Sequence, residues 1–188
     1  MSAALDEIFC EGITESIVTT VSNDGIPNAA PMGVVRRGDS IFIRMYPGTK
    51  TLRNVADTGC LVANITTDPM VYVVTAFEDL NCSGYAYEHN MPPPRLKNAS
   101  AYAYFNAKAN GAVELDPVDA VILERTVPRF SRSFAAIIEA TITGTRLRFY
   151  RGDEGLKKIH ECEVIVNKCG GQRDNDAMKK LKEILDIQ

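Results

Sequence analysis

The chain has 188 residues, with a formal net charge of −3, 45% hydrophobic residues and 24% charged residues. This length and composition are those of one globular domain, or of one domain with an added substructure. The acidic balance argues against a protein that binds nucleic acid, because such proteins need an excess of Lys and Arg to neutralise phosphates.

Apolar runs and cysteines exclude further classes of protein. No apolar run approaches the roughly 20 residues that cross a bilayer, and residues 1–10 lack the basic and then apolar layout of a secretory signal. We therefore expect no membrane association and a cytoplasmic location. The five cysteines form no CxxC pair, so neither a disulfide framework nor a zinc site is predicted.

Runs of β-branched and aromatic residues predict an antiparallel β-barrel. The first two runs flank Asp24-Gly25, a dipeptide that suits a tight hairpin turn. Seven strands are predicted, at residues 15–22, 26–36, 40–45, 60–65, 70–77, 99–108 and 120–127. Residues 78–98 contain Gly84 and Pro92-Pro93-Pro94, so we expect a loop able to move over a site, and no central strand.

Helical periodicity marks other segments. Residues 49–57 predict a short helix with caps at both ends, since Gly59 follows directly. Residues 156–169 and 174–185 predict a C-terminal helical hairpin.

The segment 131–147 fits two interpretations. Its apolar residues lie on one helical face, yet they are β-branched enough for a strand, and we favour the helix. The predicted fold is therefore α+β, with a barrel domain at residues 1–128 and a helical extension at residues 129–188.

The sequence lacks the motifs of a self-contained catalytic apparatus. It has two histidines, and no GxSxG, HExxH or paired-carboxylate pattern occurs. His160 lies among charged residues of a predicted surface helix, whereas His89 is a candidate for a substrate contact. No metal site is predicted, because no residues lie at ligand spacing. Any catalysis would then depend on a bound cofactor.

One segment has the features of an anion-binding site. Gly48-Thr49-Lys50-Thr51 places a lysine, two hydroxyls and unpaired N–H groups at a predicted helix N-terminus, and Arg44 lies at the end of the preceding strand. The segment lacks the spacing of a Walker A sequence. A helix N-terminus flanked by two cations suits a phosphate dianion. An ordinary capped helix with solvated charges explains the same residues equally well.

Several short runs within residues 12–80 together resemble the FMN-binding split-barrel superfamily of flavin reductase-like proteins. They are Ile17-Val18-Thr19-Thr20, Asp24-Gly25, Asn28-Ala29-Ala30-Pro31-Met32-Gly33-Val34 and Arg44-x-Tyr46-x-x-Thr49-Lys50-Thr51-x-x-Asn54. More closely, the chain resembles a small, mostly archaeal family of uncharacterised proteins in that superfamily. The resemblance implies an antiparallel split β-barrel that binds FMN, here with a C-terminal helical extension.

The resemblance also implies roles for individual residues. The strand expected to line the isoalloxazine ring supplies Asn28, Ala30, Pro31, Met32 and Gly33. The residues expected to hold the phosphate are Arg44, Thr49, Lys50 and Thr51. Asn54 would support the ribityl chain or its loop. Thr19 and Thr20 are candidate ring contacts, although Thr19 fits an ordinary half-buried strand position as well.

Superfamily members generally form homodimers with the flavin at the subunit interface, which implies a homodimer here. Asn64 and Thr67 are the candidates for contacts to the flavin of the other copy. Two functions follow. The first is an FMN-dependent oxidoreductase for a small molecule, favoured by the open segment with His89, Tyr85 and Tyr87. The second is a flavin-binding module without turnover, for storage or sensing, because split barrels have several functions.

Overall fold

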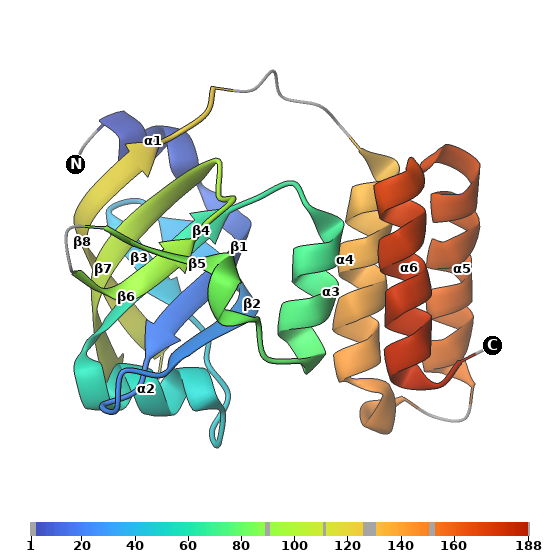
Figure 1. The fold of residues 1–188 in the computed structure, drawn as a ribbon, viewed down its shortest axis with the longest axis horizontal. Coiled ribbons are helices and arrows are strands. Elements are labelled where there is room, and N and C mark those ends of the chain that lie inside the picture. Colours follow the sequence, from blue (N-terminus) through green and yellow to red (C-terminus); the bar gives the residue numbers. More distant parts are fainter. Residues whose placement is uncertain (1–2, 89–90, 111, 126–130, 151–152, 188) are drawn as a thin grey trace. The chain divides into compact units, whose positions relative to one another are not determined.

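The structure is a computed structural model that describes residues 3–88, 91–110, 112–125, 131–150 and 153–187. The chain forms two compact units, a barrel unit from Met1–Thr66 and Asp79–Thr126 and a helical unit from Thr67–Glu78 and Val127–Gln188 (Figure 1). The boundary predicted between residues 128 and 129 lies outside the described residues.

The barrel unit contains a closed antiparallel barrel. Its elements are α1 (Ala3–Ile8), β1 (Gly12–Val21), β2 (Pro27–Arg37), β3 (Ser40–Ile43), α2 (Lys50–Thr58), β4 (Cys60–Ile65), the 3-10 helix η1 (Cys82–Gly84), β5 (Tyr85–Glu88), β6 (Met91–Leu96), β7 (Ala101–Asn110) and β8 (Ala112–Ile122). Six strands close in the order β1-β2-β3-β8-β7-β4, and β5 pairs with β6 in a separate hairpin. The predicted antiparallel barrel is confirmed.

The barrel interior is a continuous apolar core. Successive strand residues point to opposite faces, so every second residue of a strand faces inward, as Leu61 and Ala63 of β4 do. The helices α1 and α2 close opposite ends of the barrel (Figure 1), and they add Leu5 and Val55 to the same core. Full burial of one such large apolar side chain stabilises the fold by about 1.5–3 kcal/mol.

Two predictions for this unit were wrong. The segment 78–98 is not a continuous loop, because it contains η1 and the β5–β6 hairpin. Its prolines are tolerated since β6 pairs with a strand on one side only. The strand predicted at 120–127 begins much earlier, at Ala112, and the pairing of β7 with β8 shifts register between Tyr104 and Phe105. Such a shift accommodates Pro117 within β8.

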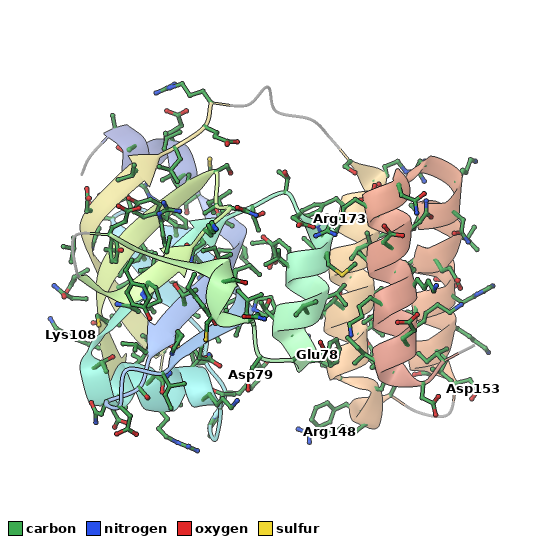
Figure 2. The ribbon with its side chains drawn as sticks, in the orientation of Figure 1. Glu78, Asp79, Lys108, Arg148, Asp153 and Arg173 are labelled. Carbon is green, nitrogen blue, oxygen red and sulfur yellow. The ribbon has the colours of Figure 1, made fainter. Side chains whose placement is uncertain are left out.

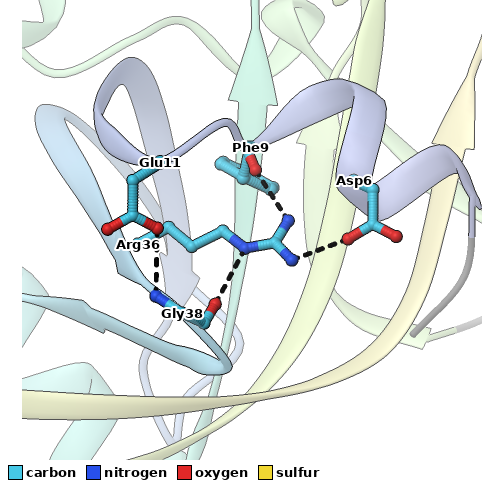
Figure 3. A network of polar contacts seen from close by, with 5 residues as sticks. All are labelled: Asp6, Phe9, Glu11, Arg36 and Gly38. Atoms are coloured by element: carbon cyan, nitrogen blue, oxygen red, sulfur yellow. Dashed lines mark hydrogen bonds and ion pairs between the residues drawn. The ribbon is translucent and has the colours of Figure 1, made fainter.

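The partly buried guanidinium of Arg36 ties α1 to the turn between β2 and β3. Arg36 donates to the carbonyl of Phe9 (2.8 Å), to the carboxylate of Asp6 (2.7 Å) and to the carbonyl of Gly38 (3.2 Å), as Figure 3 shows. The N–H of Gly38 in turn donates to Glu11 at 3.0 Å. The Arg36 side chain is only 14% exposed, so these contacts hold the end of the barrel closed by α1.

The helical unit is a bundle. Its elements are α3 (Pro69–Phe77), α4 (Arg132–Thr145), the 3-10 helix η2 (Leu147–Phe149), α5 (Glu154–Cys169) and α6 (Gln172–Leu185). Its own core includes Val73, Ile137, Ile159 and Leu181, one from each helix. The helix favoured at 131–147 and the C-terminal hairpin are thereby confirmed. None of the helices in the described residues is long and apolar enough to span a membrane.

The strand predicted at residues 70–77 is wrong, because these residues form α3. Asp68 caps the helix by accepting a hydrogen bond from the N–H of Met70 at 3.0 Å, and Pro69 occupies the first turn. Tyr72 and Val73 are buried, and Tyr72 packs edge to face against Phe134 of α4 at 5.5 Å between ring centroids. Packing within the bundle therefore overrides the strand propensity of this β-branched run.

Candidate functional site

The N-terminus of α2 presents unpaired backbone donors. Thr49 is the N-cap, and its hydroxyl accepts a hydrogen bond from the N–H of Leu52 (3.3 Å) and donates to the carbonyl of Tyr46 (2.9 Å). The N–H groups of Lys50 and Thr51 have no acceptor among the described residues. Together with the helix dipole, these groups favour an anion at this point.

Two side-chain amides hold α2 against the first strands. The amide of Asn28 on β2 donates to the hydroxyl of Thr51 at 3.1 Å, and the amide of Asn54 donates to the hydroxyl of Thr20 on β1 at 3.0 Å. Thr20, Thr51 and Asn54 are buried. The predicted site residues Thr20, Asn28, Thr51 and Asn54 are therefore brought together, but their contacts position the helix, and the Thr51 side chain does not face outward.

The charged groups at this end of the barrel are exposed. Arg44 follows β3 and makes no ion pair with any described residue. The ammonium of Lys50 lies 2.7 and 2.8 Å from the two carboxylate oxygens of Asp79, and these side chains are 62% and 76% exposed. We call the set of Arg44, Thr49, Lys50 and the free N–H groups of α2 the anion seat.

One edge of β2 is open beside the anion seat. β1 pairs with β2 along its whole length, whereas β3 pairs only with residues 34–37. Along residues 28–33 no second described strand pairs with β2, so main-chain N–H and C=O groups on that edge are free to bind a partner. The Asn28–Thr51 hydrogen bond joins this open edge to α2.

The residues predicted to line the flavin ring do not share one face. Met32 packs against the barrel core, and the pleat places Ala30 on the same inward side. Pro31 and Gly33 face outward. A Cβ added to Gly33 would lie 2.7 Å from the side chain of Ile13, so this glycine is explained by its neighbour on β1. Any ring contact along this strand therefore depends mainly on its backbone.

Thr19 and Asn64 anchor the β5–β6 hairpin. The hydroxyl of Thr19 donates to the carbonyl of Pro94 at 2.6 Å, and the oxygen of Asn64 accepts from the N–H of Leu96 at 2.8 Å. The Asn64 amide also donates to the carbonyl of Ile17 at 2.8 Å. Both side chains are fully buried, so the structure does not bring them to the anion seat. Their contact with a flavin stays a prediction.

The remaining candidates are separate from the seat. Thr67 precedes α3 and belongs to the helical unit, so its predicted role toward a second copy also stays a prediction. His89 lies outside the described residues. Tyr85 is buried and Tyr87 exposed, and burial, with the Asp79 charge as a smaller cause, raises the pKa of Tyr85 to about 12.

A tyrosine pair occupies the outer face of β7. Tyr102 and Tyr104 pack edge to face at 5.7 Å, and the Arg95 guanidinium lies 5.4 Å from the ring centroid of Tyr102. The Tyr104 hydroxyl is buried and has no hydrogen-bond partner within the described residues. Burial raises the pKa of Tyr104 to about 12.

Sequence reasoning missed Asp79. It lies 29 positions after Lys50 in a segment that was expected to be a loop, and no local pattern links the two residues. Only the fold brings them together.

The closed antiparallel barrel followed by helices defines a split-barrel protein of the flavin reductase type. A candidate flavin reductase with a split barrel domain from Shewanella frigidimarina has this fold, with 15% identity and a TM-score of 0.50 over 64% of this chain and 72% of that chain. This likeness concerns the fold alone.

The chain belongs to the DUF447 family, described as proteins of unknown function. The N-terminal domain of that family matches residues 14–127 and its C-terminal part matches residues 131–183. A crystal structure of an FMN-bound protein of this family from Methanosarcina mazei is similar to the chain, with 31% identity and a TM-score of 0.86. The match covers 96% of this chain and 99% of that one.

Proposed function

We propose that this protein binds FMN, with the phosphate at the anion seat and the isoalloxazine ring at the open edge of β2, and that it is an FMN-dependent oxidoreductase for a small molecule. The observation that carries the proposal is the junction of these two features through the Asn28–Thr51 hydrogen bond. The FMN-bound relative from Methanosarcina mazei supports the choice of cofactor.

The residues of the seat fit a phosphate. Two free N–H groups, the Lys50 ammonium and the Arg44 guanidinium supply donors and positive charge. A carboxylate, that of Asp79, already lies against Lys50, so the seat attracts an anion within the chain itself. The open edge of β2 offers free main-chain carbonyls and N–H groups to the polar edge of a flavin ring, although Pro31 supplies only its carbonyl.

The chain would contribute binding and orientation. FMN supplies the hydride or electron transfer when it is bound. The Asn28–Thr51 and Asn54–Thr20 hydrogen bonds fix α2 relative to β1 and β2, so the distance between the phosphate and ring positions is set by the fold. The described side chains of the seat include no histidine or thiol, a composition that equally suits a flavin-binding module for storage or sensing.

Flavin titration tests the cofactor and its phosphate site. Purified protein should be yellow or should take up added FMN, with quenching of flavin fluorescence. Replacing Arg44 and Lys50 together by alanine should weaken FMN binding by at least roughly 100-fold, because charge-assisted hydrogen bonds contribute about 1.5–3 kcal/mol each. Riboflavin, which lacks the phosphate, should bind the wild type and the double variant with equal affinity.

Arg125→Ala is a matched control, since Arg125 is an exposed cation that pairs with Glu7 of α1, at the other end of the barrel. It should leave FMN affinity unchanged. A wild-type protein that takes up no FMN would overturn the proposed function, and an unchanged affinity of the double variant would overturn the position of the phosphate.

Turnover separates the two functional candidates. The FMN-loaded protein is mixed anaerobically with NADH or NADPH, and the loss of flavin absorbance is followed. Bleaching by either donor, with reoxidation by an acceptor, supports the oxidoreductase. Failure of both donors favours the binding module.

We also propose that the protein forms a homodimer with the flavin at the subunit interface. A partly exposed apolar row on the outer face of the barrel supports an interface, because Ile13, Val35 and Phe42 are cross-strand neighbours, Ile13 is 68% exposed and the other two are half-buried. Light scattering should give the mass of two chains, and Ile13→Lys should give one chain with weaker FMN binding. A monomeric wild type that binds FMN would refute the dimer.

A further inference from the structure

The Lys50–Asp79 ion pair joins two distant parts of the barrel unit. Asp79 is the first residue of the segment that re-enters this unit after α3, and both of its carboxylate oxygens lie within 2.8 Å of the Lys50 ammonium. Glu78, directly before it at the end of α3 (Figure 2), pairs instead with Lys180 of the helical unit at 2.7 Å. Neighbouring carboxylates therefore have separate partners, and the Asp79 carboxylate lies against Lys50 of the anion seat.

The turn after Asp79 is held by contacts of its own, so the backbone that carries the carboxylate is fixed in place. The side-chain oxygen of Asn81 accepts from the N–H of Ser83 at 3.3 Å. Leu80 lies so close to Gly84 that a Cβ there would be 2.8 Å from Leu80 Cδ2. These contacts hold the chain that directly follows Asp79.

A carboxylate and a phosphate dianion cannot both use Lys50 without cost. The two Asp79 oxygens engage the donors of an ammonium that has only three, and a phosphate beside them adds like-charge repulsion. The pair is largely exposed, and exposed ion pairs are weak, so a dianion that also gains the free N–H groups of α2 can displace the carboxylate.

We propose that Asp79 competes with the FMN phosphate for Lys50 and so lowers the affinity of the site for phosphorylated flavin, an inference that rests on the proposed function. Flavin without a phosphate does not use Lys50 and is unaffected. Asp79 therefore sets how strongly the site discriminates FMN from riboflavin.

The test is a titration of the full-length apoprotein with FMN and, separately, with riboflavin. Asp79→Asn removes the negative charge and keeps the size of the side chain, and it should bind FMN roughly two- to fivefold more tightly, the range expected for an exposed ion pair. Riboflavin affinity should not change. In the Lys50→Ala background, Asp79→Asn should have little effect on FMN, because the contested cation is missing.

Asp57→Asn is the matched control for net charge. Asp57 is an exposed carboxylate in the last turn of α2, the helix that begins with Lys50. Its replacement should alter the affinity for neither FMN nor riboflavin. Equal urea midpoints of the variants and the wild type verify that all are folded.

The outcomes are distinct. Tighter binding of FMN alone supports the competition. Weaker FMN binding by Asp79→Asn would mean that Asp79 orients Lys50 for the phosphate, and unchanged FMN binding would mean that the pair is irrelevant, so either result overturns the inference while the proposed function stands. A wild type that binds no FMN overturns both.

Discussion

Tyr104→Phe should stabilise the protein, because the hydroxyl that it removes is buried without a partner. The Tyr104 side chain is 5% exposed, and its oxygen has no hydrogen-bond partner in the part of the chain that the structure describes. A buried polar group that leaves water without finding a partner costs about 1–3 kcal/mol. Phenylalanine keeps the ring and its edge-to-face contact with Tyr102.

The expected gain in the free energy of unfolding is about 1–2 kcal/mol, since the void left by one oxygen offsets part of the benefit. With a urea slope of about 2 kcal/mol per molar, the midpoint should rise by roughly 0.5–1 M. Tyr102→Phe is the control, because the Tyr102 hydroxyl is not among the unpartnered buried atoms, and it should bring no such gain.

Alkaline pH gives a second measure of the same group. Burial raises the pKa of folded Tyr104 to about 12, above its ordinary value of 10.0, so the folded state disfavours the phenolate. The contribution of Tyr104 to the free energy of unfolding is therefore constant below about pH 10. It falls as the pH rises from about 10 toward 12, by up to about 1.4 kcal/mol per pH unit. The advantage of Tyr104→Phe should widen over that window. A variant less stable than the wild type at neutral pH would refute the reasoning.

Two further predictions concern contacts within the barrel unit, one between Arg36 and the α1 region and one between Asn64 and the β5–β6 hairpin. Arg36→Met should lower the free energy of unfolding by about 2 kcal/mol, because it leaves the Phe9 carbonyl and the Asp6 carboxylate without their donor. Urea unfolding measures this change, and an unchanged urea midpoint would contradict it. Asn64→Ala should free the β5–β6 hairpin, seen as faster amide hydrogen exchange at Leu96 with little change in β7. Unchanged exchange at Leu96 would show that the hairpin is held by other contacts.

The sequence predicted the barrel because its strands and turns carry local signals, but α3 shows where such signals conflict. Residues 70–77 are rich in β-branched and aromatic side chains, which favour a strand. Asp68-Pro69 before them is a helix start, with an N-cap acceptor followed by a residue suited to the first turn. Burial in the bundle core, which no local window contains, decides between the two.

The limits of β8 were missed for a related reason. Asp116-Pro117 interrupts the pattern of β-branched residues, and a proline normally argues against a strand interior. The structure accepts it because the register with β7 shifts near Phe105. A bulge depends on the partner strand, so the sequence of one strand alone does not reveal it.

The candidate site divides in the same way between local and tertiary signals. The helix start at Thr49 and the flanking cations Arg44 and Lys50 could be found from sequence, because caps and charges are local features. The open edge of β2 could not, since it exists only because β3 ends opposite Val34. The Asp79 carboxylate could not either, for it reaches Lys50 from 29 residues away.

The run from Thr49 to Asn54 therefore contains residues that position α2 and a residue that is available to a ligand, and the sequence motif alone does not tell them apart. Thr49 caps α2, Thr51 accepts from Asn28, and Asn54 donates to Thr20, so each of these side chains already has a partner within the fold. Of the side chains in this run that were expected to contact a flavin, only Lys50 has an exposed partner, the Asp79 carboxylate, which a ligand can displace. Substituting the partnered residues should disturb the position of α2 and the affinity for riboflavin and FMN alike, whereas substituting Lys50 should affect FMN alone.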